Sequence, residues 1–151
     1  MKKSFAFGLI MAALFTGINA SAQLPDCTLS IGGKDTAVLI QVFQLNEEQK
    51  NTMEMWIGEL QTQNKLIEDE IKVLLEKHPQ STQEDLETLA KKYKVLKDKM
   101  LAISKGYDSK LLGLFNPKQY QRYAELCNEA LRKPITPSIT AKAEPQPENP
   151  D

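Results

Sequence analysis

Hydrophobic residues recur at alternating steps of three and four along two long stretches of the chain. The first series is Met53, Ile57, Leu60, Asn64, Ile67, Ile71 and Leu74, with one polar member. The second is Leu86, Leu89, Tyr93, Leu96, Met100, Ile103, Tyr107 and Leu114. This spacing is typical of a helix seam that packs lengthwise on another helix. Pro79 lies between the two series and disfavours helix before it, so the pattern predicts two long helices joined by a turn.

The two seams match as an antiparallel hairpin. Facing residues in such a hairpin have a constant sum of residue numbers, and the pairs from Met53 with Tyr107 to Leu74 with Leu86 all sum to 160. Asn64 is the polar member of the seam. An asparagine there typically sets the register, because a shift would bury an unpaired amide, and a functional polar socket is the alternative.

Capping signals mark where the long helices begin. Asn46 and Gln49 form a capping box at the start of the first helix, which is expected to run to about Lys77. Ser81 and Glu84 have the S-x-x-E spacing of a capping box and predict the start of the second.

A third, shorter helix is predicted after the hairpin. Asn116 caps it, Pro117 occupies its first position and Gln119 completes the box. Helical spacing predicts one inner face, formed by Tyr120, Tyr123, Ala124, Cys127 and Leu131. Pro134 is expected to end this helix.

The segment Thr36–Gln44 before the hairpin is short and apolar, with Asp35 as its expected cap. Its β-branched residues would suit a strand, but no other segment offers a strand partner. A short buried helix is therefore expected. The fold class is all-α, a long antiparallel helical hairpin with a short N-terminal helix and a shorter C-terminal helix.

The chain begins with a pattern typical of a secretory signal peptide. Two lysines precede an apolar run, and Ala20-Ser21-Ala22 provides a cleavage site after Ala22. We expect export to the periplasm or beyond, with a signal peptide at 1–22, a helical domain at 23–133 and a disordered tail at 134–151. The tail holds five of the chain's eight prolines.

Charge and cysteine content narrow the function classes. Removing Lys2 and Lys3 leaves 17 basic and 20 acidic residues, so a nucleic-acid partner or membrane insertion after cleavage is not expected. Cys27 and Cys127 lie at opposite ends of the domain and predict one disulfide in an oxidising compartment. Two separately buried thiols are the alternative.

Candidate chemistry is sparse. The chain has one histidine and no Cys/His cluster for zinc, no phosphate-binding loop and no nucleophile–base pair. We therefore expect no catalytic residues, no metal and no cofactor, which leaves binding by surfaces as the function class.

Several apolar residues fall outside the seams and predict a surface for a client or partner protein. This predicted surface consists of Leu66, Val73, Val95 and Leu101 with nearby lysines that include Lys92 and Lys97. The alternative is that the two short helices cover these residues as part of the core.

The two capping segments carry a family resemblance. Leu45-Asn46-Glu47-Glu48-Gln49 and Phe115-Asn116-Pro117-Lys118-Gln119 resemble the paired L-T-x-x-Q motifs of the Spy/CpxP family of periplasmic proteins. Leu45 and Phe115 take the apolar place, Asn46 and Asn116 the capping place, and Gln49 and Gln119 the closing place.

The resemblance implies an all-helical envelope protein that forms a cradle-like homodimer. Its relatives act as ATP-independent chaperones, as partners of stress-sensor kinases or as metal-responsive proteins. We expect a holdase that captures unfolded proteins in the envelope stress response. The alternative is a regulatory or structural module that binds one folded partner, such as a sensor-kinase domain.

Overall fold

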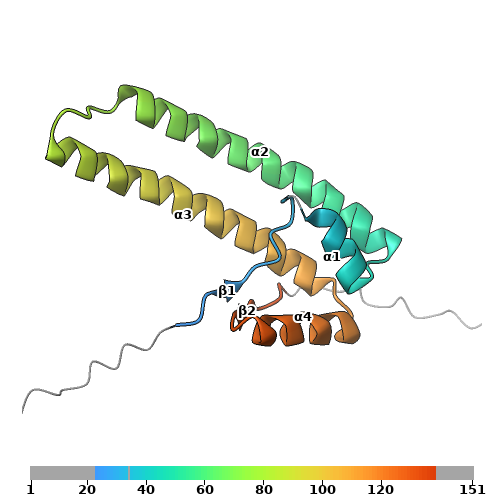
Figure 1. The fold of residues 1–151 in the computed structure, drawn as a ribbon. Helices are drawn as coiled ribbons and strands as arrows, with labels where there is room; N and C mark the ends of the chain where they lie inside the picture. The colour runs from blue at the N-terminus through green and yellow to red at the C-terminus, as the bar shows by residue number, and fades with distance from the viewer. Residues whose placement is uncertain (1–22, 34, 139–151) are drawn as a thin grey trace, which may run out of the picture.

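The computed structural model describes residues 23–33 and 35–138 and confirms the all-α hairpin (Figure 1). The elements in chain order are β1 (Asp26–Cys27), α1 (Thr36–Phe43), α2 (Glu47–Lys77), α3 (Gln83–Gly113), α4 (Pro117–Glu129) and β2 (Lys133–Pro134). Helices α2 and α3 form the hairpin. Both short helices and the parallel β1–β2 pair gather at its open end, which we call the base; the α2–α3 turn is the tip.

Helix α2 begins and ends where predicted, whereas the capping box of α3 lies one residue later than predicted. Thr82 is the N-cap of α3, and its hydroxyl accepts a hydrogen bond from the Asp85 N–H at 3.1 Å. The Asp85 carboxylate accepts from the N–H groups of both Ser81 and Thr82. The Ser81–Glu84 prediction was wrong, because this register lets one carboxylate satisfy two backbone donors.

The segment before the hairpin is helical, as expected, but only partly buried. Phe43 is the one buried residue of α1, while Val38 and Val42 are exposed. Asp35 occupies the N-cap position without forming a capping hydrogen bond through its side chain. In this helix of eight residues at the edge of the base, Leu39 and Ile40 are partly buried against the core, and the side with Val38 and Val42 faces water.

Helix α4 ends earlier than predicted. It stops at Glu129, and Leu131 adopts a left-handed φ of 51° and is 72% exposed, so Leu131 does not belong to the inner face. This turn sends the chain back across the base, where Lys133–Pro134 pairs in parallel with Asp26–Cys27. Pairing with β1 takes the place of a last helical turn.

The hydrophobic core lies at the base. It includes Met53, Trp56 and Leu60 of α2, Tyr107, Leu111 and Leu112 of α3, and Tyr123 and Cys127 of α4. Ile135 is also buried in this core, although the sequence suggested that the ordered domain ends at residue 133. The packed part therefore continues past that boundary, and residues 139–151 of the predicted tail lie outside the described residues.

Towards the tip, the hairpin stands without cover from the other described elements. Leu86 and Tyr93 belong to the predicted seam, yet Leu86 is 45% exposed and Tyr93 is exposed as well. Asn64 is half-buried, and its Oδ1 atom is buried without a hydrogen-bond partner. Ile67 and Leu89 are buried between the two helices, but two helices alone cannot enclose the whole width of their seam, so Leu86 and Tyr93 remain accessible.

The hairpin register gives a direct test by disulfide crosslinking. Cysteines at Ile57 and Ile103 should crosslink efficiently, because these positions sum to 160, whereas cysteines at Ile57 and Met100 should crosslink less well. Gel mobility without reductant measures both yields, in a Cys27→Ser/Cys127→Ser background that avoids mispairing. The opposite ranking of the two yields would show that the register is different.

Candidate functional site

Two capping boxes open α2 and α4, as the sequence predicted. In α2, Asn46 Oδ1 accepts from the Gln49 N–H at 2.8 Å, and Gln49 Oε1 accepts from the Asn46 N–H at 3.0 Å. Asn116 and Gln119 form the same pair of bonds in α4, each at 2.9 Å. Each box satisfies backbone donors that would otherwise lack partners at the helix start.

The two glutamines also bond to each other across the base. Gln49 Nε2 donates to Gln119 Oε1 at 2.8 Å, and Gln119 Nε2 donates to Gln49 Oε1 at 3.0 Å. Both side chains are buried. This reciprocal pair, which we call the glutamine brace, joins the start of α2 to the start of α4.

Each glutamine of the brace also bonds to the backbone of the opposite helix junction. Gln49 Nε2 donates to the Leu114 carbonyl at 2.7 Å, and Gln119 Nε2 donates to the Phe43 carbonyl at 3.0 Å. Leu45 is buried in the core, and Phe115 packs against the Phe43 ring with centroids 4.9 Å apart. The paired motifs therefore have a structural role and hold the base together.

Sequence reasoning identified both boxes but missed their connection. A capping box uses only the oxygen of its glutamine, so the amide nitrogen still has two donors to satisfy. Two glutamines in apolar surroundings with donors left over were the signal that could have revealed the brace.

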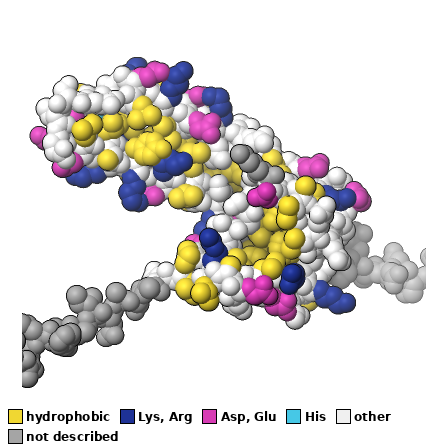
Figure 2. Space-filling model, viewed as in Figure 1, with side chains coloured by type: hydrophobic (Ala, Val, Ile, Leu, Met, Phe, Trp, Pro, Cys, Tyr) yellow, Lys and Arg dark blue, Asp and Glu magenta, His cyan; other side chains and the backbone are white. Residues whose placement is uncertain are grey.

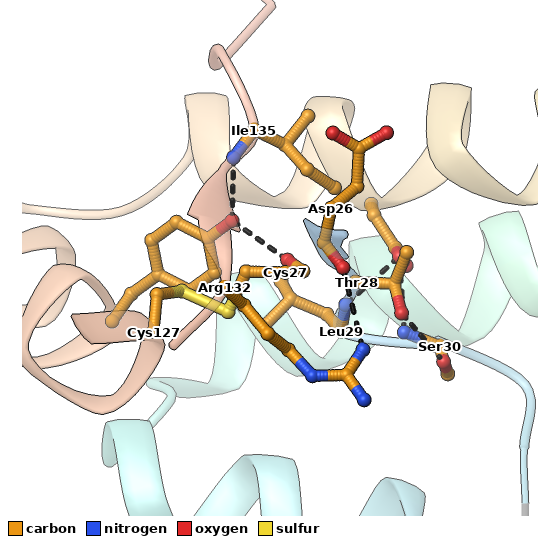
Figure 3. The surroundings of a disulfide bond; sticks show 10 residues. Asp26, Cys27, Thr28, Leu29, Ser30, Cys127, Arg132 and Ile135 are labelled. Carbon is orange, nitrogen blue, oxygen red and sulfur yellow. Dashed lines mark hydrogen bonds between the residues drawn. A yellow bond between two sulfur atoms is a disulfide. The ribbon is translucent and has the colours of Figure 1, made fainter. Parts of the chain in front are cut away.

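A disulfide ties the N-terminal segment to α4, which confirms the predicted Cys27–Cys127 pair (Figure 3). The two Cα atoms are 5.7 Å apart. Beside it, the Tyr123 hydroxyl donates to the Cys27 carbonyl and accepts from the Ile135 N–H, both at 2.8 Å. Burial raises the pKa of Tyr123, so the phenol keeps the proton that this donation requires. We call residues 24–33, which the disulfide anchors, the strap.

The strap is held to α3 by one buried carboxylate that the sequence analysis did not single out. Asp108 is 1% exposed and accepts hydrogen bonds from the N–H groups of Leu29, Ser30 and Ile31 at 2.9, 3.0 and 3.1 Å. Burial raises the pKa of Asp108, and the three N–H donors oppose that shift. The sequence signal for this carboxylate was its place on α3, shortly before the apolar residues Leu111 and Leu112 near the end of the helix.

The predicted client or partner surface is exposed in the structure. Leu66 is 63% exposed, Val95 and Leu101 are each 66% exposed, and Val73 is also exposed. Lys92 and Lys97 are exposed as well. The two short helices pack at the base, so they do not cover these residues.

The four apolar residues of that surface do not share one face of the hairpin. At 100° per residue, Leu101 lies within about 20° of Asp108 around α3, on the side that holds the strap. Val95 lies about 140° away from Asp108, and Leu66 lies about 180° around α2 from Ile57, which the strap contacts. The hairpin therefore has a front face, towards the strap, and a rear face.

Each face carries its own exposed apolar residues. The front face has Leu75, Leu86, Tyr93 and Leu101, and the rear face has Met55, Leu66, Val73 and Val95. Figure 2 is drawn from the strap side and shows hydrophobic side chains gathered over the tip half of the hairpin, with charged side chains around them. Of the four front-face residues the sequence analysis predicted only Leu101 as surface, because it assigned Leu86 and Tyr93 to a closed seam and did not single out Leu75.

The described residues offer surfaces rather than reactive groups. Within 23–33 and 35–138, no cluster of three or more His, Cys, Asp or Glu side chains could hold a metal ion. None of the helices in these ranges is long and apolar enough to cross a membrane.

Comparison with protein-family models, curated proteins and solved structures finds no match to this chain. The fold defines a class only, an all-α hairpin protein closed at its base by a disulfide.

The glutamine brace should appear as an energetic coupling. Gln49→Leu and Gln119→Leu should each destabilise the fold by about 1–3 kcal/mol, because each leaves buried partners unsatisfied. The double variant should cost less than the sum of the two, by roughly 0.5–3 kcal/mol. Urea unfolding of the four proteins measures this coupling, and strictly additive effects would show that the glutamines act independently.

Replacing the buried carboxylate should loosen the strap. Asp108→Asn should lower the free energy of unfolding by about 1–3 kcal/mol, because an amide oxygen cannot serve all three N–H groups and its NH₂ group faces donors. Asp98→Asn, at an exposed α3 position, should change it by less than about 0.5 kcal/mol. Equal urea midpoints for the two variants would contradict the role of Asp108.

Proposed function

We propose that this chain is an exported helical binding protein of the periplasm that holds unfolded polypeptides without a nucleotide, in the manner of the Spy/CpxP family. The observation that carries the proposal is the pair of apolar faces on a hairpin that is covered only at its base. Leu66 and Val95 on one face and Leu101 on the other are each more than 60% exposed. Exposed apolar surface of this kind is typical of interaction sites.

Capture by these faces would rest on many weak contacts. Burial of apolar area contributes roughly 25 cal/mol per Å², so each side chain of these faces adds little affinity on its own, and the faces tolerate many client sequences. The exposed Lys92 and Lys97 would speed the encounter with acidic segments. Such a holdase needs neither a cofactor nor ATP, because release follows from weak binding.

Location and assembly belong to the same proposal. The disulfide supports an oxidising compartment, where disulfides form and persist. The signal peptide predicted at 1–22 lies outside the described residues. The cradle-like homodimer rests on the family resemblance, with apolar faces of two hairpins lining a shared concave surface.

The decisive experiment is suppression of aggregation. The purified mature chain should keep several unrelated unfolded proteins soluble in the absence of ATP, as measured by light scattering. Activity towards all of them is the expected result. If the chain suppresses the aggregation of none of them, the holdase proposal is wrong. That result would favour a module that binds one folded partner, such as a sensor-kinase domain.

Substitution of exposed leucines tests the surfaces themselves. Leu66→Ser/Leu101→Ser removes one apolar group from each face and should reduce capture while changing the free energy of unfolding by less than about 1 kcal/mol. Gln61→Ser/Glu87→Ser, at one exposed polar position on each helix, is the matched control and should capture clients normally. Loss of the helical circular dichroism signal in the leucine variant would show that these residues are core.

A further inference from the structure

The first described residues lie outside the packed base. Gln23, Leu24 and Pro25 are all exposed, and Leu24 is 53% exposed. Among the described residues, the first hydrogen bond to the rest of the fold is at Pro25, whose carbonyl accepts from the Lys133 N–H at 2.9 Å. Figure 1 shows the start of the described chain pointing away from the four helices. Gln23 is therefore an exposed residue directly before the strap.

Gln23 has a particular chemistry if it is the first residue of the exported chain. The predicted cleavage after Ala22 would leave Gln23 with a free α-amine. In an N-terminal glutamine, this amine can reach the amide carbonyl of its own side chain and close a five-membered ring. Holding both groups in one residue gives the nucleophile a high effective concentration. α-Amines titrate at about pH 8, so part of them is unprotonated and nucleophilic at neutral pH.

We propose that Gln23 is modified to pyroglutamate in the exported chain. The α-amine nitrogen forms a bond to Cδ, and the bond between Cδ and the side-chain nitrogen breaks. That nitrogen takes up the proton that the amine loses and leaves as ammonia. The step changes no oxidation state and needs no second substrate. The inference rests on the export and cleavage that belong to the proposed function, and it is independent of the holdase activity.

The fold allows this ring to form after folding is complete. The strap is fixed from Pro25 onward, by the bond to Lys133 and then by the Cys27–Cys127 disulfide. Gln23 lies two residues before the first of these ties, and its side chain is exposed. Ring closure therefore needs no rearrangement of the packed base, and the folded protein is a competent substrate.

The modification would protect the strap at its exposed end. Aminopeptidases act on a free α-amine, and the lactam has none. The strap behind it carries Cys27 and the three backbone N–H groups that Asp108 binds. Trimming into the strap would remove its ties to α4 and α3, so a blocked first residue preserves the closed base in a compartment that contains peptidases.

The intact mass of the exported chain tests the proposal. The full-length chain with its own leader is expressed in a Gram-negative host, isolated from the periplasm and measured by mass spectrometry before any digestion. The expected mass is that of residues 23–151 less one ammonia, and fragmentation should place the loss on residue 23. The matched control is Gln23→Asn, whose side chain is one methylene shorter. The same attack would then close a strained four-membered ring, so this variant should keep its ammonia.

Sensitivity to an aminopeptidase gives a second readout. The enzyme should remove the first residue of the Gln23→Asn variant and leave the wild type unchanged. A wild-type chain that begins at Gln23 and still keeps its ammonia, after incubation at neutral pH and physiological temperature, would overturn the inference and leave the proposed export intact. Removal of Gln23 from the wild type by the aminopeptidase would also overturn it.

A chain that begins at a different residue would overturn both the inference and the predicted cleavage site. Neither result changes the outcome of the aggregation experiment, which tests the holdase separately.

Discussion

The reciprocal bond between Gln49 and Gln119 is the constraint on which the arrangement of the helices depends. A buried primary amide must satisfy two donors and an acceptor, and the Nε2 groups of Gln49 and Gln119 find their acceptors in the opposite helix junction. The two turns that lead into α2 and α4 are therefore held in one relative position. Because this brace lies at the base, it fixes the position of α2 and α4 relative to each other there, and it makes no contact with the tip of the hairpin.

The strap closes the base from the other side. Its disulfide joins residues 100 positions apart, which on the chain-entropy model is worth roughly 4–5 kcal/mol. Asp108 and Tyr123 bind the strap backbone independently of that bond. A domain whose core lies at one end buries little apolar surface. The disulfide and the buried hydrogen bonds therefore contribute much of its stability.

The division between base and tip connects the fold to the proposed function. Within the described residues, the elements other than the hairpin pack at the base, and the exposed side chains of Leu66 and Val95 lie along the uncovered length. A stable base allows the tip to keep apolar surface in water without unfolding. Holding weakly bound chains needs this combination, because the binding residues contribute little to the stability of the protein that carries them.

The periodicity of apolar residues and the caps at Asn46 and Asn116 determined the helices, since both signals act within a few residues along the chain. Two cysteines behind a predicted signal peptide were enough to predict the Cys27–Cys127 bond. The brace, the three bonds to Asp108 and the buried Ile135 needed the tertiary structure, because each joins residues that the sequence separates by 12 to 79 positions. The tertiary structure also decided that Leu86 and Tyr93 are exposed. A seam pattern shows that two helices pack together, and only the position of the other elements decides which part of that seam remains open to water.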